Sequence, residues 1–251
     1  MNAIARLPTR KAEAYRYADI AALGRVWPDL AAPRELVIPA GETHSHVLIA
    51  DAEPTEIHRA TIRVEAGASM ALFVLNHAAE YGRIELDVSL HRSASFSLYA
   101  ANIGGGAATQ EIVTTVRHLE PDATSRQTVR SVLAGAATGS YLGKVAVARH
   151  AQKSDGSQSV KAILLDRGAT ANCKPELEIY ADDVQCAHGA SVGELDPDQL
   201  FYAACRGISP AGAKALLLEG FVMSLWDDIA DPAQRDAIIA ASRAALRQVT
   251  A

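Results

Sequence analysis

The residues best suited to chemistry in this sequence are Cys186 and His188, which are separated by a single alanine. On a β-strand, residues i and i+2 point to the same side, so the thiol and the imidazole would lie next to each other. Such a pair could bind iron or zinc, or the imidazole could activate the thiol as a nucleophile. Two side chains do not complete a metal site, so the remaining ligands would come from another chain or a cofactor. The plainer alternative is a small buried thiol beside a hydrogen-bonded histidine.

A second pair with the same spacing is His44 and His46. Two imidazoles on one side of a strand could serve a divalent metal. We favour the alternative, in which they are polar residues on the wet face of an edge strand. The other histidines occur singly, and we expect structural roles for them.

The three cysteines, Cys173, Cys186 and Cys205, are odd in number, and no two of them have the close spacing of a Cys-x-x-Cys motif. This pattern fits neither a disulfide framework nor a self-contained zinc site. We therefore expect reduced thiols in a cytoplasmic protein. Cys205 falls in an expected helix, where we predict a small core residue.

Composition excludes several classes of protein. The 251 residues carry a net charge of −5 and only 5% aromatic side chains, which argues against nucleic acid as a partner. The most apolar stretch, 132–148, is short, contains Lys144, and falls below the roughly 20 residues of a membrane span. Arg6, Arg10 and Lys11 precede no apolar segment, so we expect no secretory signal. Phosphate-loop and nucleophile-elbow motifs are absent from the sequence, and Gly104-Gly105-Gly106 is expected to be a flexible loop.

The middle of the chain is expected to be built of strands. Short runs with alternating or β-branched residues recur there, as is typical of half-buried strands. These runs are 35–38, 47–49, 57–64, 72–75, 84–90, 95–99, 112–116, 159–165 and 176–180.

Between these runs, a small-residue corner that ends in Ala-Ser or Ala-Thr occurs five times. Its alanines are Ala68, Ala94, Ala123, Ala169 and Ala190, so the step from Ala123 to Ala169 is the longest. That step could hold two turns of half its length. Strands joined by small corners at a fairly regular period indicate a parallel β-solenoid, in which stacked coils share one core. An antiparallel sandwich or jelly roll is the alternative, but it would favour more tight hairpin turns.

Three proline-led helix starts follow at the C-terminal end. Asp196-Pro197, Ser209-Pro210 and Asp231-Pro232 each place an N-cap residue before proline at the first helical position. We expect helices that end near residues 205, 226 and 249. Three short helices are too few for a core of their own, so they must pack on the solenoid or present a face to a partner.

Several motifs resemble the SufB/SufD family of iron–sulfur cluster assembly. The resemblance is carried by KPELEIYADDV at 174–184, CAHGA at 186–190, DQLFY at 198–202 and RGI at 206–208. LPTRK at 7–11 and YRY at 15–17 resemble the start of the SufD branch, so both ends of the chain match. Members of that branch often have a longer N-terminal helical region than the short segment that precedes the first expected strand here. Cys173 and Cys205 lie outside the matched motifs.

The resemblance implies a mainly β fold: a right-handed parallel β-helix core at 35–193, a short N-terminal segment at 1–34 and a C-terminal helical segment at 194–251. It implies a non-catalytic subunit that pairs with SufB and docks the ATPase SufC. His188 and Cys186 would contribute to a transient iron or iron–sulfur cluster at the interface with SufB, while this chain alone binds no cofactor. The predicted SufC-docking residues are Leu200, Phe201, Leu217 and Phe221.

Two other functions remain open at this stage. A β-helix enzyme acting on polysaccharide would need paired carboxylates, for which Asp182 and Asp183 are candidates, although neighbouring strand residues face opposite sides. A SufB-like primary scaffold, or a homodimer that replaces it, would be favoured by a glutamate beside the histidine. Gly189 occupies that position here, which argues against this alternative.

Overall fold

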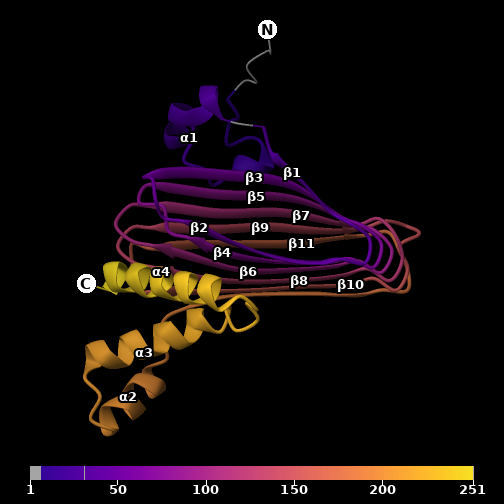
Figure 1. Cartoon of the computed structure of the whole chain (residues 1–251). Coiled ribbons are helices and arrows are strands. Elements are labelled where there is room, and N and C mark those ends of the chain that lie inside the picture. Colours follow the sequence, from indigo (N-terminus) through magenta and orange to yellow (C-terminus); the bar gives the residue numbers. More distant parts are fainter. Residues whose placement is uncertain (1–6, 31, 251) are drawn as a thin grey trace.

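The computed structural model describes residues 7–30 and 32–250, which form a parallel β-helix flanked by helices at both ends (Figure 1). Odd-numbered strands form one six-stranded sheet, in the order β1-β3-β5-β7-β9-β11, and even-numbered strands form the other, β12-β10-β8-β6-β4-β2. The strands are β1 Arg34–Ile38, β2 Thr43–Ala50, β3 Thr55–Val64, β4 Ser69–Asn76, β5 Tyr81–Leu90, β6 Ser95–Gly104, β7 Thr109–His118, β8 Thr124–Leu133, β9 Thr138–Val147, β10 Asp155–Leu164, β11 Thr170–Ile179 and β12 Gln185–Gly193.

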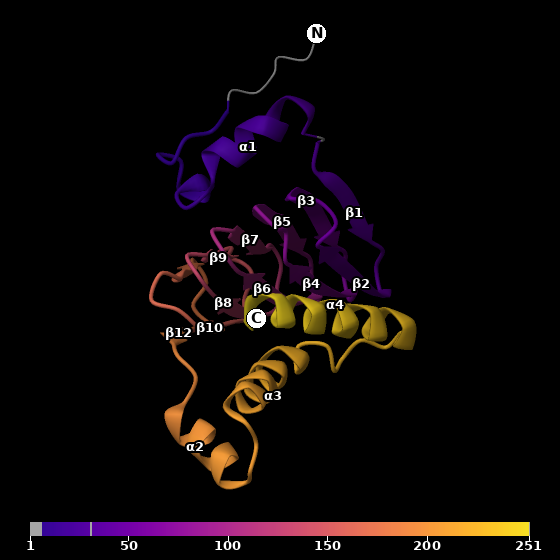
Figure 2. The same cartoon turned by 90° about the vertical axis from the view of Figure 1, so that its left-hand side faces the viewer.

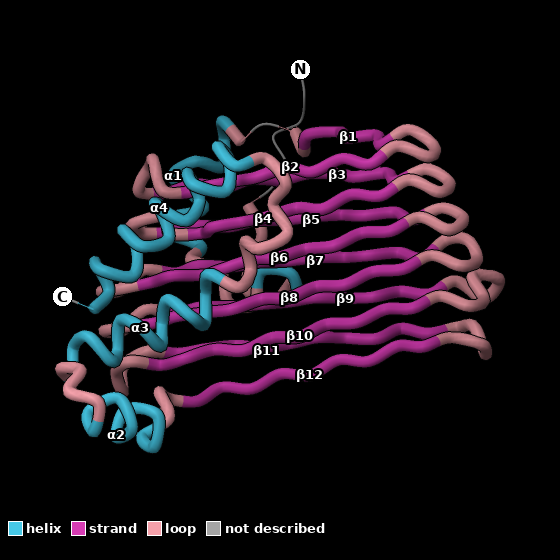
Figure 3. The backbone as a smooth tube through the Cα atoms, turned by 60° about the horizontal axis from the view of Figure 1, so that its bottom comes forward, coloured by secondary structure: helices cyan, strands magenta, loops and turns pink. Residues whose placement is uncertain are grey.

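Each coil of the β-helix contributes one strand to each sheet, and successive coils stack in register (Figure 3). Thr55 pairs with Tyr81, Tyr81 with Thr109, Thr109 with Thr138 and Thr138 with Thr170, so the coils lengthen slightly along the chain. The expected parallel β-helix is therefore confirmed. The predicted strand runs did not include β8, β9 or β12. Arg and Gln in β8 and glycines in β9 and β12 interrupt the apolar alternation.

Three of the five predicted corners stack as expected. Ala68, Ala94 and Ala123 are completely buried and precede strands that pair in register. Each follows a residue with positive φ, a conformation that turns the chain sharply. These residues are Gly67 at 67°, Ser93 at 56° and Asp122 at 64°, and Lys153 at 60° takes the same place in the next coil.

Of the other two predicted corners, one lies elsewhere on the coil and one is not a corner. Ala169 lies at the opposite end of the coil, directly before β11, in line with Ala108 and Ala137. Ala190 lies inside β12. The long step from Ala123 to Ala169 therefore joins two different corners and does not hold two equal turns.

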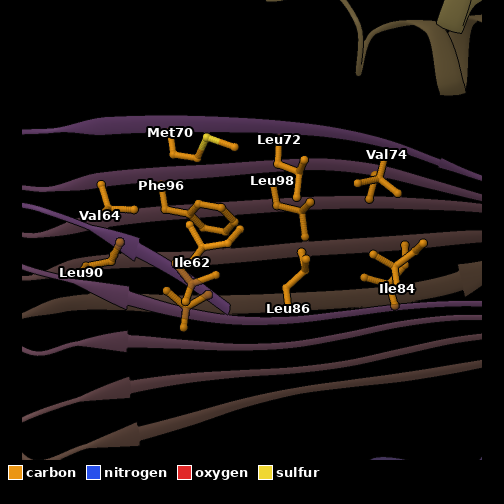
Figure 4. Close-up of a cluster of buried hydrophobic side chains, with 14 of the residues drawn as sticks. Ile62, Val64, Met70, Leu72, Val74, Ile84, Leu86, Leu90, Phe96 and Leu98 are labelled. Carbon is orange, nitrogen blue, oxygen red and sulfur yellow. The ribbon is translucent and has the colours of Figure 1, made fainter. Parts of the chain in front are cut away.

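The core lies between the two sheets, where alternate residues of every strand point inward. Figure 4 shows part of it, with Met70, Leu72 and Val74 of β4 facing Ile84 and Leu86 of β5. All five are almost completely buried. Stacking completes this core, because each coil covers the apolar face of its neighbour.

The C-terminal helices begin where the sequence predicts. α2 (Pro197–Cys205) and α3 (Pro210–Met223) have proline in the first turn, and the side chains of Asp196 and Ser209 accept hydrogen bonds from backbone amides. α4 (Pro232–Thr250) lies along the outer face of the even-numbered sheet, while α2 projects away from the β-helix (Figure 2). Trp226 is completely buried between α4 and that sheet, and its indole donates to Ser242 Oγ at 3.1 Å.

The N-terminal segment packs on the outer face of the odd-numbered sheet. It contains the short helices η1 (Glu13–Tyr15), α1 (Ile20–Val26) and η2 (Trp27–Asp29). Arg83 of β5 anchors it, because this buried guanidinium donates to Ala14 O at 2.9 Å and to Glu111 Oε2 at 3.1 Å. The ring of Tyr15 covers the same guanidinium at 4.2 Å. Residues 1–6 and 31 of the expected 1–34 segment lie outside the described part, and so does Arg6.

Within 7–30 and 32–250, none of the helices combines the length and the apolar character that crossing a membrane requires.

Candidate functional site

The strand that carries the Cys-Ala-His motif, β12, forms one edge of the even-numbered sheet. It pairs only with β10, and its other edge has no partner in the described chain. All but one of its residues are exposed. An unpaired strand edge offers a row of N–H and C=O groups to another strand.

Cys186 and His188 occupy positions that face the lumen of the β-helix. Cys186 is in register with Gly156 and His188 with Gln158, and both of these β10 residues are buried inside the coil. The thiol and the imidazole are therefore on the same side of β12. His188 is exposed because no further coil lies above it.

Cys186 is more buried than His188, although a single residue separates them. Cys186 is half-buried among Val145, Leu177 and Val184. Burial raises the pKa of its thiol, with the backbone N–H of Gly156 acting in the opposite direction. A protonated thiol is a poor nucleophile, so the structure disfavours the activated-nucleophile interpretation. A metal would have to displace this proton.

A buried network of hydrogen-bonded side chains from both sheets lies next to His188 inside the β-helix. Gln158 Nε2 donates to Tyr141 OH at 2.9 Å, and Tyr141 OH donates to Gln127 Oε1 at 3.0 Å. Thr114 Oγ1 donates to the same Gln127 oxygen at 2.6 Å. Burial raises the pKa of Tyr141 to about 12, so its hydroxyl remains a donor. Gln158 Oε1 is buried and has no hydrogen-bond partner among the described residues.

The structure adds a second sulfur to this end of the β-helix. Cys173 of β11 is in register with buried Tyr141, so it faces the lumen from the other sheet. Burial raises its pKa as well. Extending the alternation of 176–180 backwards would have placed Cys173 on the inner face with Leu177. The core role expected for Cys205 was wrong, because it is exposed at the end of α2.

Residues of successive coils that are in register form columns along the lumen. His44 and His46 begin the two columns that end at Cys186 and His188, respectively. Within the described ranges, no three Cys, His, Asp or Glu side chains come close enough to hold a metal.

The predicted docking residues divide between two surfaces. Phe201 of α2 is 71% exposed, and Leu200 and Leu217 are half-buried. Phe221 instead packs toward the β-helix, where Arg130 lies 5.7 Å from its ring centre. The motifs did not single out Leu216 of α3, whose side chain is also exposed.

A small apolar cavity of about 400 Å³ lies between α2 and α3. Tyr202, Ile208, Leu216 and Leu217 line it, and the first three of these are exposed. The exposed surface formed by Phe201, Tyr202, Ile208 and Leu216 is called the α2–α3 patch below.

The carboxylates of the polysaccharide alternative do not form a strand pair. Asp182 and Asp183 lie in the loop between β11 and β12, and the amide of Asp183 bonds to Gln152 Oε1 at 2.9 Å. Their strand assignment was therefore wrong.

These features define a parallel β-helix protein whose last coil exposes a strand edge, a thiol and an imidazole. The family model "SUF system FeS cluster assembly, SufBD core domain" matches residues 35–221, well over half of the chain. The chain belongs to this SufBD core family.

Curated relatives agree with the SufD branch of the family. The chain is 34% identical over 127 residues to "Iron-sulfur cluster assembly protein SufD" of Escherichia coli strain K12, which covers 51% of this chain and 30% of that protein. It is 29% identical over 175 residues to a protein of Synechocystis sp. PCC 6803 described as an iron–sulfur cluster assembly SufBD family protein, covering 68% and 39%. The match to SufD of Bacillus subtilis strain 168 is 28% over 127 residues, covering 51% and 29%. The chain thus matches well under half of the length of these relatives.

Proposed function

We propose that this chain is a SufD-type, non-catalytic subunit of a cytoplasmic SufBCD scaffold for iron–sulfur cluster assembly. The observation that carries the proposal is the open last coil, where an unpaired β12 edge lies beside lumen-facing Cys186 and His188. Family membership supports the role in cluster assembly.

SufB pairs with this chain along β12. Nearly all of β12 is exposed, so a second strand can add to the sheet without displacing any described element. Strand addition supplies main-chain hydrogen bonds, and the side chains at the edge supply specificity. A β-helix partner that pairs there would also close the open lumen.

The nascent cluster is the cargo held at this interface. His188 supplies an exposed imidazole and Cys186 a half-buried thiol from one side. No third ligand accompanies them in the described chain, so the partner supplies the rest. Imidazole and thiolate are both ligands that iron accepts.

SufC docks on the α2–α3 patch. Exposed aromatic and aliphatic side chains grouped around an apolar cavity are typical of a protein-interaction surface. The chain has no phosphate loop of its own, so ATP hydrolysis would belong to SufC. Closure of two SufC subunits would then shift the paired β-helices and expose His188.

Co-purification with tagged SufB tests the pairing. Val192 at the end of β12 is 47% exposed, and Val37 on the opposite edge strand β1 is 51% exposed. We expect Val192→Glu to reduce SufB recovery at least about tenfold, because a carboxylate would be buried at the interface. The matched variant Val37→Glu should bind SufB like the parent. Equal recovery with both variants would refute pairing through β12.

Self-association provides the alternative outcome. If the chain forms a stable dimer alone, and Val192→Glu dissolves that dimer while SufB recovery is unchanged, β12 serves a homodimer instead. The thermal midpoint of both variants should match the parent, since both valines lie on exposed edges.

A further inference from the structure

The N-terminal end of the β-helix holds a cavity that the proposed function does not use. It has a volume of about 470 Å³ and lies between the first coil and the α1–η2 segment. Leu36, Leu48 and Ile62 form its inner wall, and Val26 and Leu30 contribute from the N-terminal segment. This volume is within the range of small-molecule sites.

The lumen-facing residues change character at this end of the β-helix, where each column begins. In three columns, a cation or an imidazole replaces the apolar side chains of the following coils. The columns run Arg34–Ala60–Leu86, His46–Leu72–Leu98 and His58–Ile84–Ile112. The polar groups therefore gather at the mouth of an apolar cavity, and apolar side chains lie behind them.

The charges around this mouth favour an anion. The lining residues include three arginines and a single carboxylate, Asp29. Arg25 pairs with Glu80 at 2.5 Å, and Arg59 lies 3.8 Å from Glu85. Arg34 takes part in no ion pair or side-chain hydrogen bond with the described residues, so its guanidinium is available.

His46 and His58 differ in whether their imidazole rings are free to bind a ligand. His58 already bonds to Glu56 at 2.9 Å. Burial, assisted by the charge of Arg34, lowers the pKa of His46. At neutral pH the His46 ring is thus an uncharged hydrogen-bonding group beside a free guanidinium.

We propose that this cavity binds a small organic anion with an apolar body, of the class of medium-chain carboxylates. The carboxylate would pair with Arg34, and His46 would donate a second hydrogen bond to it. The alkyl chain would lie against Leu36, Leu48 and Ile62 and remove their exposed surface from water.

Calorimetric titration of the whole protein with octanoate tests this site. We expect saturable 1:1 binding, with much weaker binding of acetate, which lacks the chain, and of 1-octanol, which lacks the charge. Arg34→Gln should weaken octanoate binding about tenfold, as loss of a charge-assisted hydrogen bond implies. The matched control Arg63→Gln, an exposed β3 arginine whose side chain is 56% accessible, should leave it unchanged.

A second pair of variants locates the site. Ala60→Phe should fill the cavity and abolish binding, whereas Ala187→Phe on exposed β12 should not affect it. Methyl NMR shifts of Leu36, Leu48 and Ile62 on adding octanoate would report the cavity directly.

Three results would overturn the proposal: no saturable octanoate binding, equal affinity for 1-octanol, or unchanged binding by Ala60→Phe. Equal affinity for 1-octanol would mean a merely apolar cavity. Loss of binding at high protein concentration would instead indicate that a second copy of the chain occupies it.

Discussion

His188 owes its accessibility to its place in the last coil. Gln158, one coil earlier in the same column, is only 3% exposed, whereas His188 has no strand above it. The same column thus holds a core residue in one coil and a candidate ligand in the next. Whether a lumen-facing residue of this column can bind a ligand therefore depends on whether it lies in the last coil.

The first residue-scale prediction concerns His188→Ala. Within the complex with SufB and SufC, we expect reconstituted iron and the visible absorbance of the cluster to fall at least about tenfold, because a ligand is lost. Co-purification of the partners should be unchanged. His150→Ala, which alters an exposed histidine in the β9–β10 turn, is the control. Full cluster formation by His188→Ala would show that this imidazole is neither a ligand nor a gate.

A second residue-scale prediction follows from His118, which is completely buried and bonds to Ser125 Oγ at 2.8 Å. Burial lowers its pKa from 6.5 to about 4. Between these values the unfolded chain binds the extra proton, so acidification favours unfolding. Neutral His118 therefore makes the free energy of unfolding higher above about pH 6.5 than at low pH. The difference is about 3 kcal/mol and is lost as the pH falls toward 4.

Urea unfolding at pH 7.5 and pH 5 measures this effect. His118→Gln should lose less stability between the two pH values than the parent, although it starts from a lower value. His150→Gln should behave like the parent. An identical pH dependence of the parent and His118→Gln would show that other groups cause the acid sensitivity.

At the scale of elements, the two proposed interfaces lie on separate parts of the molecule. β12 ends the even-numbered sheet, and α2 projects away from the β-helix (Figure 2). α3 is held by apolar contacts to α4 and to the outer face of the sheet, whereas α2 contacts mainly α3. This arrangement leaves one side of α2 free for a partner.

Phe201→Glu tests this separation. We expect it to reduce SufC recovery at least about tenfold, because it places a charge in the centre of the α2–α3 patch. SufB recovery should remain at the parent level, while Val192→Glu should show the reverse pattern. If Phe201→Glu retains SufC fully, the docking surface lies elsewhere.

At the scale of the whole molecule, stability must vary along the stack of coils. A central coil has a neighbour on both sides, whereas the coils containing β1 and β12 have one. In such arrays each coil is stabilised largely by its neighbours, so the ends open most readily.

Hydrogen exchange followed by mass spectrometry tests this gradient. Amides of β5 to β9 should exchange at least about tenfold more slowly than those of β12. Adding SufB should slow exchange in β12 and leave the central coils unchanged. Uniform exchange along the stack would contradict the gradient, and unchanged β12 exchange with SufB bound would contradict edge pairing.

Local patterns in the sequence were sufficient for much of this description. Alternating residues predicted most strands, and Asp or Ser before proline predicted all three C-terminal helix starts, because strand alternation and N-capping act over a few residues. The Cys-Ala-His spacing also placed both side chains on one side of a strand. By itself, the sequence determined the class of fold and the motif.

Only the tertiary structure decided which surfaces are open. Ala169 and Ala190 look like Ala68 in sequence, yet one lies at another corner and one inside β12, because coils of unequal length shift the register. Cys205 is exposed because no described segment covers the end of α2, whereas Phe221 is partly buried because α3 packs against the sheet. Burial depends on which distant segment covers a residue, and no local pattern records that.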